Sequence, residues 1–414
     1  MRKRNDLLSR RDFVKGGAAL AAASTFTIIK PQSVRGSAAN SMVEVGWVGC
    51  GGQGTRDASL LEVTKEAKIV ALADYFQDQL DKARTKFQVE PKNAHVGIDA
   101  YKAIMESKVD AVLLTTPPGF RPEHFKAAMA AKKHVFMEKP LAVDVPGCHV
   151  VADAGDKATA QKLTVVVGLQ RHYSKAYRKC KELIDQGALG TVVMAHAAWD
   201  QGDLWKDRRG KRADWPSQID YEVRHWYFFK WLCGDHIVEQ NIHNIDVINW
   251  MLGTHPIKAS GFGGRLVRTD IGEIYDHFNL VYEYPHQVLL NDTAVQIDGV
   301  RNDVSETIRG TKATFTTTAG KGGTGGARIE GIKGRNDADT PLIYKYEGVD
   351  DKHYDQEAAI FVKSLKGEGE HRDDTKYGVE STFTAILGRE AAYRRETLSW
   401  DKLWNSNERL TFKG

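Results

Sequence analysis

Cysteine is scarce in this sequence, with four in 414 residues, and no two of them form a C-x-x-C pair. Cys50, Cys148, Cys180 and Cys233 lie too far apart for a disulfide-rich scaffold, so we expect free thiols. No run approaches the roughly 20 uninterrupted apolar residues that a membrane-spanning helix needs. Aromatic side chains are plentiful (9 Trp, 14 Tyr and 15 Phe), which argues against disorder and for a folded chain of one or two domains.

Charge of one sign is also scarce outside the N-terminus. The whole chain carries a formal charge of +4, but residues 1–39 hold eight Lys and Arg against two Asp, a net of +6. The remainder therefore has a charge of about −2. A body with this balance has no electrostatic footprint for nucleic acid, and we expect no such partner.

Paired arginines dominate the N-terminal segment. Ser9–Lys15 reads S-R-R-D-F-V-K and matches the twin-arginine export motif S-R-R-x-F-x-K. The Ala-rich stretch Gly16–Ile29 follows, and small residues at 37–39 offer a cleavage site. We expect residues 1–39 to be a signal region that takes the folded protein through the twin-arginine export machinery to the periplasm. The alternative is a basic amphipathic helix that belongs to the fold.

A glycine-rich turn follows the first predicted strand, residues 43–48. The turn has the G-x-G-x-x-G pattern of dinucleotide-binding folds, and a second strand, residues 68–73, ends at Asp74, 20 residues beyond the last glycine. The glycines would let the backbone approach a pyrophosphate, and the aspartate would accept hydrogen bonds from the adenosine ribose. Because a 2′-phosphate would meet a like charge at Asp74, we expect NAD rather than NADP. The cofactor-binding residues predicted here are Gly49, Gly51, Gly52, Gln53, Gly54 and Asp74.

Strands and helices continue to alternate up to residue 170. Further strands are predicted at residues 110–114, 134–137 and 163–168, which indicates a parallel Rossmann sheet over residues 43–170. Functional residues collect at the carboxyl ends of such strands. We therefore expect Thr116, Pro117, His124, Glu138 and Lys139 at the cofactor, with the Lys139 amine directed toward the nicotinamide.

The second half, residues 171–370, has longer strands of alternating polarity. They are predicted at residues 191–199, 257–267, 277–284, 287–297 and 304–309. This run indicates an α+β domain with a large, mostly antiparallel open sheet, one face of which is free to pair in a homo-oligomer. A helix over residues 382–394, in the terminal segment 371–414, is expected to brace the two halves.

One helix is predicted over residues 234–253. At about 100° per residue, Glu239, His243 and Asp246 fall on one face, with His236 nearby. A carboxylate one turn from a histidine can orient the imidazole for proton transfer. A metal site is the first alternative, although H-x-x-E-x-x-x-H matches no standard ligand spacing, and we expect no metal. A solvated polar face is the second.

The chain resembles the Gfo/Idh/MocA family of NAD(P)-dependent oxidoreductases of sugars and inositols. The resemblance rests on residues 49–54, Asp74, Thr116-Pro117, Glu138-Lys139-Pro140 and the helix at residues 234–253. It implies that Lys139 is catalytic and that the family's D-x-x-x-H pair corresponds to Glu239 and His243, with Asp246 as the following aspartate. Glu239 departs from the family pattern by one methylene. At the domain crossover, Arg171 and Tyr173 are further candidates for binding substrate, beside His243, and His172 lies between them. The aromatic cluster at residues 226–231 could stack on the apolar side of a sugar ring, although such clusters more often belong to a core.

These observations lead to three functional hypotheses. The first is an NAD-dependent oxidoreductase of a secondary alcohol on a carbohydrate or polyol, in which His243 takes the hydroxyl proton and Lys139 stabilises charge on the oxygen. The second is a glycosidase that uses NAD without net redox change, by transient oxidation of the ring followed by elimination. The third is a sugar sensor without catalytic activity, as some relatives have become regulatory proteins.

Overall fold

The computed structural model of the protein describes residues 42–317, 326–332, 340–348 and 353–413. The predicted signal region, residues 1–39, lies outside these residues. Residues from Met42 onward form one compact unit. Within the part of the chain that the structure describes, no helix is long and apolar enough to cross a membrane.

The first sheet is parallel throughout, with the strand order β3-β2-β1-β4-β5-β6. Its strands are β1 (Val43–Val48), β2 (Ala67–Asp74), β3 (Ala94–Val96), β4 (Ala111–Leu114), β5 (His134–Met137) and β6 (Val165–Val167). The register aligns Val48 with Leu114, Leu114 with Met137 and Met137 with Val167, so the carboxyl ends of these four strands form one even edge. The strand order reverses between β1 and β4, which is where parallel sheets of this type bind ligands. The expected Rossmann sheet is confirmed.

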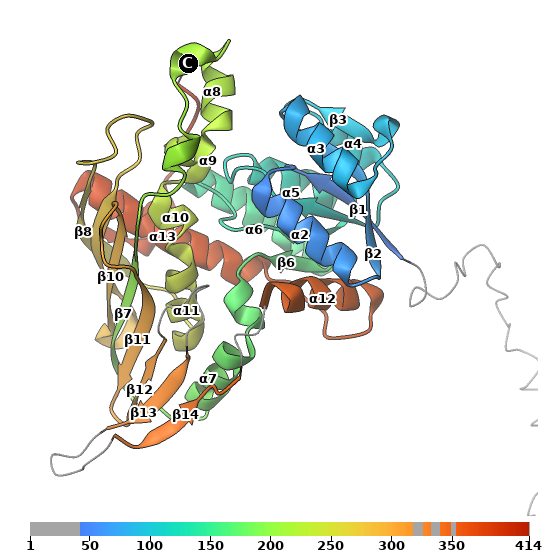
Figure 1. Cartoon of the computed structure of the whole chain (residues 1–414). Coiled ribbons are helices and arrows are strands. Elements are labelled where there is room, and N and C mark those ends of the chain that lie inside the picture. The colour runs from blue at the N-terminus through green and yellow to red at the C-terminus, as the bar shows by residue number, and fades with distance from the viewer. Residues whose placement is uncertain (1–41, 318–325, 333–339, 349–352, 414) are drawn as a thin grey trace, which may run out of the picture. The chain divides into compact units, whose positions relative to one another are not determined.

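Helices cover both faces of this sheet (Figure 1). On one face lie α2 (Gly52–Val63), α3 (Gln77–Phe87) and α12 (His353–Lys366), and on the other α4 (Tyr101–Glu106), α5 (Arg121–Ala130) and α6 (Val145–Gln161). The sequence placed α12 with the second domain, but Phe361 and Val362 are buried in the same cluster as Leu61 of α2. The amphipathic pattern of a helix fixes which side is buried, not which sheet it packs against.

The second sheet has nine strands in the order β14-β13-β12-β11-β7-β10-β9-β8-β15. They are β7 (Val192–Gln201), β8 (Lys258–Gly264), β9 (His277–Glu283), β10 (Leu289–Gln296), β11 (Asp303–Gly310), β12 (Ala313–Thr316), β13 (Arg328–Gly331), β14 (Leu342–Lys345) and β15 (Leu398–Ser399). β10 runs parallel to β7, and the other pairs are antiparallel. The predicted large, mostly antiparallel sheet is therefore confirmed.

The remaining helices pack around this sheet or connect it to the first. They are α7 (Lys175–Asp185), α8 (Gln218–Arg224), α9 (Lys230–Cys233), α10 (His236–Glu239), α11 (Ile242–Leu252), α13 (Thr375–Arg394) and α14 (Trp400–Trp404), with short 3-10 turns η3 (Pro91–Asn93), η4 (Gln170–Tyr173), η5 (Lys206–Arg208), η6 (Arg212–Asp214), η7 (Trp226–Phe228) and η8 (Pro285–Gln287). α13 contacts both α6 and β8, and it begins earlier than the helix predicted over residues 382–394, at Thr375. All four cysteines are buried free thiols, as expected.

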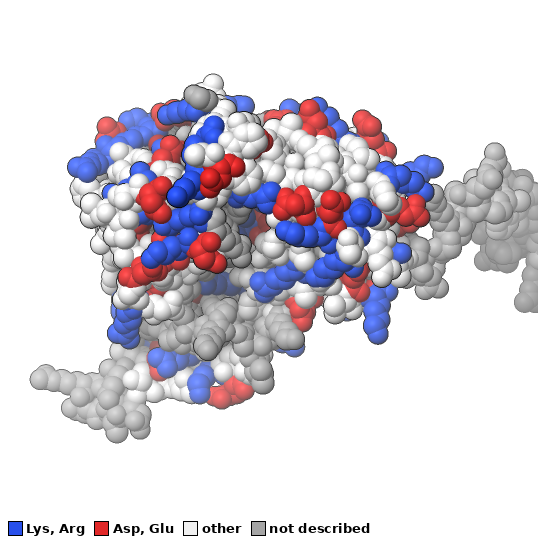
Figure 2. Space-filling model, turned by 45° about the horizontal axis from the view of Figure 1, so that its top comes forward, with Lys and Arg blue, Asp and Glu red and all other residues white. Residues whose placement is uncertain are grey.

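Lys and Arg side chains are interspersed with Asp and Glu over the face of the molecule in Figure 2. This face carries no continuous field of one sign, which agrees with the small net charge of the chain outside its N-terminus.

Candidate active site

The turn between β1 and α2 presents bare backbone at the edge of the first sheet. Gly49 has a φ of 96°, and a Cβ there would lie 2.5 Å from the backbone nitrogen of Thr116. Gly51 caps the N-terminus of α2, and no atom lies within 4 Å of a Cβ built on Gly51 or on Gly52. The first turn of α2 therefore faces open space with unpaired N–H groups and the positive end of a helix dipole. This arrangement suits a pyrophosphate.

Asp74 ends β2 beside this turn, as the sequence predicted. Its carboxylate accepts hydrogen bonds from the backbone N–H of Cys50 (2.6 Å) and of Phe76 (2.7 Å). Burial raises the pKa of Asp74, although these two N–H groups act against the shift. Each oxygen keeps a lone pair for a further donor, so the carboxylate is fixed in a position where it can bind vicinal hydroxyls.

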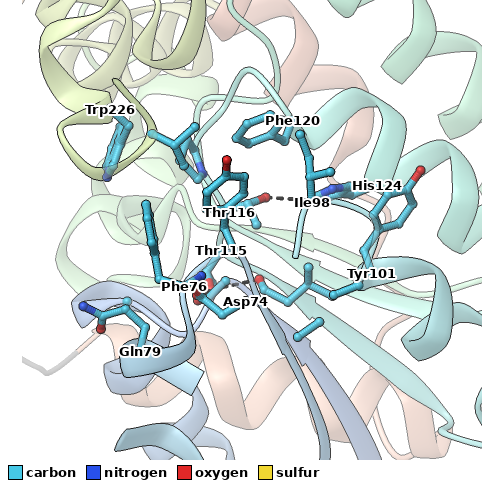
Figure 3. Close-up of a pocket in the computed structure, with 18 of the residues that line it drawn as sticks. Asp74, Phe76, Gln79, Ile98, Tyr101, Thr115, Thr116, Phe120, His124 and Trp226 are labelled. Carbon is cyan, nitrogen blue, oxygen red and sulfur yellow. Dashed lines mark hydrogen bonds between the residues drawn. The ribbon is translucent and has the colours of Figure 1, made fainter. Parts of the chain in front are cut away.

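A cleft of about 420 Å³ extends from the glycine turn over Asp74 (Figure 3). Thr116, Pro117 and His124 line it, as expected, and Thr116 Oγ1 lies 3.1 Å from His124 Nδ1. Burial, followed by the nearby charge of Arg121, lowers the pKa of His124 to about 3, so its ring is neutral. The cleft is therefore lined by both polar and apolar side chains.

The opposite wall of the cleft comes from α8 and from η7 of the aromatic cluster, and no pattern in the sequence indicated Arg224 there. Arg224 and Trp226 line the cleft with Asp74. The Arg224 guanidinium lies 3.8 Å from the centroid of the Phe76 ring and forms an ion pair of 2.6 Å with Asp78. About 150 residues separate these partners in sequence, so no local pattern could have brought them together.

A smaller pocket of about 180 Å³ adjoins the cleft and shares Thr115, Thr116 and Trp226 with it. Lys139, Glu239 and His243 line this pocket. The Lys139 Nζ donates to Oε1 of Glu239 at 2.8 Å and to the Glu239 backbone oxygen at 2.6 Å. The strand-end lysine and the later histidine therefore converge on one pocket, beside the predicted cofactor cleft.

His243 has the protonation state of a base. Its Nδ1 is buried without a hydrogen-bond partner among the described residues, and its ring stacks near Trp199 with centroids 5.6 Å apart. Burial, followed by the positive charges of Lys139 and Arg171, lowers the pKa of His243 well below 6.5. The imidazole is neutral at ordinary pH and can accept a proton.

The helix that carries these residues differs from the one predicted. The expected single helix over residues 234–253 is broken into α10 and α11, which meet at Gln240 and Asn241. The side chain of Asn241 donates to Asp292 of β10 at 2.7 Å, and this tertiary bond holds the break. His236 is fully buried near Phe278, outside the residues that line the two pockets.

Asp246 does not orient His243, contrary to expectation. Its carboxylate lies 2.9 Å from Nε2 of His172 and accepts a hydrogen bond from Ser381 at 2.8 Å. The break in the helix changes the angular relation that the sequence implied between Glu239, His243 and Asp246. Of the two carboxylates, only Glu239 lines the pocket.

Arg171 and Tyr173 belong to the protein interior rather than to the pocket. Arg171 donates to Asn244 at 2.7 Å and forms an ion pair with Glu306. The Tyr173 hydroxyl donates to Asp374. Neither residue lines the cleft or the pocket. Both side chains lie at the domain crossover, as expected, but η4 turns them toward buried acidic partners.

Glu138 lies at the floor of the pocket beside a carboxyl group that the sequence analysis missed. Gln53 Nε2 donates to Glu138 at 3.0 Å and to Asp57 at 2.9 Å. Burial, followed by the charge of Glu138, raises the pKa of Asp57. Burial also raises the pKa of Glu138, against the charges of Lys139 and Arg121. Gln53 therefore bridges two adjacent carboxyl groups whose charged forms are disfavoured by burial.

Family models match most of the described chain. A model for an oxidoreductase family with an NAD-binding Rossmann fold matches residues 43–168, and a model for the GFO/IDH/MocA C-terminal domain matches residues 177–316. A twin-arginine translocation signal model matches residues 7–27, within the predicted signal region.

Several known proteins are similar to this chain. An inositol 2-dehydrogenase of Azotobacter vinelandii is 32% identical over 193 residues, 47% of this chain and 49% of the relative, so the match spans about half of that relative. The WlbA dehydrogenase of Bordetella pertussis, in complex with NADH and UDP-GlcNAcA, matches with a TM-score of 0.67 at 17% identity, over 86% of this chain and 98% of its own. An aldose-aldose oxidoreductase of Caulobacter crescentus has a TM-score of 0.67 at 16% identity, over 86% and 99%. At these identities the two structures support the fold.

Proposed function

The chain belongs to the GFO/IDH/MocA oxidoreductase family with an NAD-binding Rossmann fold, and from this premise we propose that it transfers a hydride between a secondary alcohol of a carbohydrate or polyol and NAD. The observation that carries the proposal is the convergence of Lys139 and His243 on a pocket that adjoins the cleft over the glycine turn. The inositol 2-dehydrogenase relative supports the substrate class.

Two features of the cleft suit parts of a dinucleotide. Open space over Gly51 and Gly52 leaves room for a pyrophosphate, and the fixed carboxylate of Asp74 suits a ribose. The nicotinamide, when bound, supplies the hydride acceptor or donor. Thr116, Pro117, His124 and Glu138 would line its end of the site, together with Gln53 and Lys139.

NAD is the cofactor that the adenosine end favours. The Asp74 carboxylate would repel a 2′-phosphate. Arg224 brings a positive charge to the same cleft, but its ion pair with Asp78 neutralises much of that charge. A cofactor titration that finds NADP⁺ bound more tightly than NAD⁺ would contradict this preference.

Two side chains in the pocket would act on the substrate oxygen, one as a proton acceptor and one as a hydrogen-bond donor. Neutral His243 accepts the hydroxyl proton while the carbon loses its hydride. The Lys139 ammonium uses two of its three N–H donors on Glu239, and the third can bind the substrate oxygen as charge develops. Glu239 thereby positions Lys139 rather than His243.

The test is turnover of the purified protein with NAD⁺ and a panel of cyclic and acyclic polyols, followed at 340 nm. We expect NADH formation with at least one cyclic polyol. Lys139→Ala should remove nearly all of this activity while NADH binding persists. Turnover of the variant within a few-fold of the wild type would refute the assignment.

A redox-neutral reaction on a glycoside is a second candidate, supported by the wall over the cofactor cleft. The Tyr75 hydroxyl donates to Asp220 of α8 at 2.7 Å, and Arg224 pairs with Asp78, so two links tie this wall to the Rossmann half. Such links favour a retained dinucleotide, which a cycle of ring oxidation, elimination and re-reduction needs. Release of an aglycone at constant absorbance near 340 nm would favour this candidate, whereas stoichiometric NADH would favour the dehydrogenase.

The signal match at residues 7–27 supports export through the twin-arginine pathway, with the periplasm as the destination. We also propose a homo-oligomer formed through the outer face of the second sheet, where Phe262 of β8 is 66% exposed. Light scattering after gel filtration tests the oligomer, and fractionation of cells tests the location.

A further inference from the structure

Two tryptophans line the inner pocket together with the catalytic candidates. Trp205 and Trp226 lie in the lining with Lys139 and His243. The Trp205 ring meets Trp226 edge-on at 5.5 Å between centroids and Tyr227 at 4.6 Å. Tyr227 itself is buried, so Trp205 packs against an aromatic ring of the protein core.

The backbone of Trp205 is strained. Its φ of 56° and ψ of 26° place a bulky residue in the left-handed region, which costs an L-residue on the order of 1 kcal/mol or more. Such conformations persist only where the surrounding structure imposes them, and they are concentrated at functional sites.

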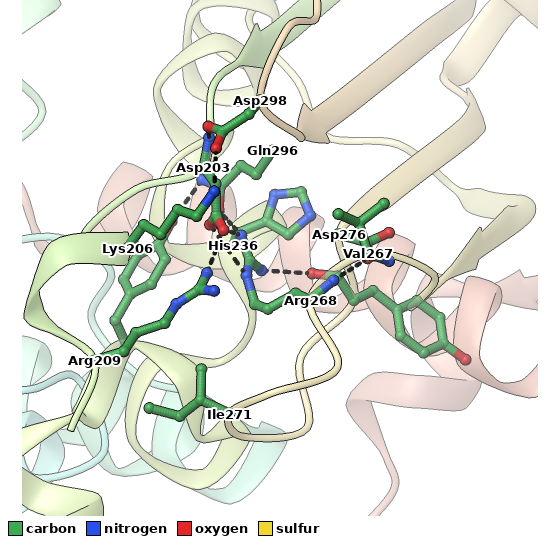
Figure 4. A network of polar contacts seen from close by, with 12 residues as sticks. Asp203, Lys206, Arg209, His236, Val267, Arg268, Ile271, Asp276, Gln296 and Asp298 are labelled. Atoms are coloured by element: carbon green, nitrogen blue, oxygen red, sulfur yellow. Dashed lines mark hydrogen bonds and ion pairs between the residues drawn. The ribbon is translucent and has the colours of Figure 1, made fainter. Parts of the chain in front are cut away.

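The residues on both sides of Trp205 form ion pairs (Figure 4). Asp203 forms ion pairs with Arg209 and with Arg268, the latter at 2.9 Å, and the Arg268 side chain is only 1% exposed. Arg268 also donates to Gln296 of β10 at 2.8 Å. On the other side, Lys206 pairs with Asp298 at 2.7 Å. The buried ion pairs of Asp203 therefore fasten the segment before Trp205 to the second sheet, whereas the Lys206–Asp298 pair after it is exposed and adds little.

The pocket offers about 180 Å³ beside this indole and adjoins the larger cleft. The dinucleotide would occupy that cleft, so a nucleotide attached to the substrate would compete with the cofactor for the same space. A single six-membered ring with hydroxyl groups presents C–H bonds on one face, and a flat aromatic ring suits such a face. The hydroxyls at the ring edge would reach Lys139 and His243.

We propose that Trp205 is the platform for the C–H face of the substrate ring and that it selects a free cyclitol or monosaccharide over both an acyclic polyol and a nucleotide-linked sugar. This proposal rests on the oxidoreductase function proposed above. It assigns a specificity role to a segment between β7 and α8 that neither the glycine turn nor the Lys139–His243 pair contains.

The experiment compares the wild type with Trp205→Leu and Trp205→Phe, using myo-inositol and D-glucose as ring substrates, D-sorbitol as the acyclic one and UDP-glucose as the nucleotide sugar. Trp404→Leu removes a tryptophan in α14 that lines neither pocket and serves as the matched control. NADH binding is measured for every variant by fluorescence titration.

We expect Trp205→Leu to raise KM for the ring substrates about 10-fold or more, with kcat within about threefold and NADH affinity unchanged. Trp205→Phe should recover part of the loss. An unchanged KM in Trp205→Leu, an equal loss for D-sorbitol, or a preference of the wild type for UDP-glucose would each overturn the proposal and leave the oxidoreductase function standing. If the wild type binds NADH but turns over none of the four compounds, both the function and the role of Trp205 are refuted for these substrate classes.

Discussion

Gly51→Ala and Gly54→Ala should affect different properties, although both glycines belong to one turn. The first should weaken cofactor binding and the second should lower the stability of the fold. A Cβ on Gly51 meets no atom within 4 Å and projects into the cleft. A Cβ on Gly54 would lie 2.3 Å from Thr115 Oγ1, 2.5 Å from the Gly49 oxygen and 2.7 Å from Trp47 Nε1. One substitution therefore tests the cofactor site and the other tests the packing beneath it.

The size of each effect follows from these contacts. The three atoms around Gly54 are hydrogen bonded to one another, with Trp47 Nε1 2.9 Å from both the Gly49 oxygen and Thr115 Oγ1. Overpacking costs about 1–3 kcal/mol, and a broken buried hydrogen bond costs about 1–3 kcal/mol, so Gly54→Ala should lower the free energy of unfolding by about 2–6 kcal/mol. Gly51 has a φ of −75°, which alanine adopts freely, so Gly51→Ala should change stability by less than about 1 kcal/mol.

Thermal unfolding and NADH titration of the nucleotide-free proteins separate the two effects. Gly51→Ala should weaken NADH binding by about 10- to 100-fold, equivalent to about 1.4–2.8 kcal/mol, because its methyl group occupies space needed by the pyrophosphate. If Gly51→Ala binds NADH like the wild type, the N-terminus of α2 is not the pyrophosphate site. If Gly54→Ala is as stable as the wild type, the close-packing argument is wrong.

Three further predictions concern protons and charge. Lys139→Met should lower kcat by about 10²- to 10⁴-fold while NADH affinity stays within a few-fold of the wild type. The exposed control Lys102→Met should leave kcat unchanged. Steady-state kinetics measures both variants, and a similar loss in the two would contradict the role of Lys139. Because burial holds the pKa of His243 well below 6.5, the acidic limb of kcat/KM should lie below pH 6.5, and a midpoint at or above that value in a profile from pH 5 to 9 would count against it as the base. Burial raises the pKa of Asp292 to about 8, above its unfolded value, so stability that is present at acid pH is lost as the pH rises toward 8. Asp292→Asn should remove this loss. The difference in free energy of unfolding between variant and wild type, measured in urea, should therefore widen by up to about 4 kcal/mol from pH 5 to pH 9. A gap independent of pH would show that Asp292 keeps an ordinary pKa.

The parts of the site that lie at the ends of parallel strands were predictable. Gly49 and Glu138 each follow a buried strand and Asp74 ends one, and parallel pairing brings such strand ends to one edge of the sheet. Sequence patterns are local, and these residues depend only on local structure and on the order of the strands.

Residues that depend on contacts between distant segments escaped the prediction. Trp205 and Arg224 reach the site because loops of the second half fold back on the first, and Asn241 breaks a helix through a bond to a strand 51 residues away. Arg171 illustrates the opposite error, because its buried partner Glu306 lies 135 residues away. A charged residue near a crossover has the same local pattern whether it faces a pocket or an interior ion pair.

The position of α12 in the sequence constrains the order in which the first domain can fold during synthesis. The layer that supports the glycine turn contains α2 from near the start of the chain and α12, residues 353–366, from near its end. While the ribosome is still synthesising the intervening residues, the apolar side of α2 lacks α12 as its packing partner. The nucleotide-binding half can therefore be completed only after α12 has been synthesised, although all six strands of its sheet precede residue 168.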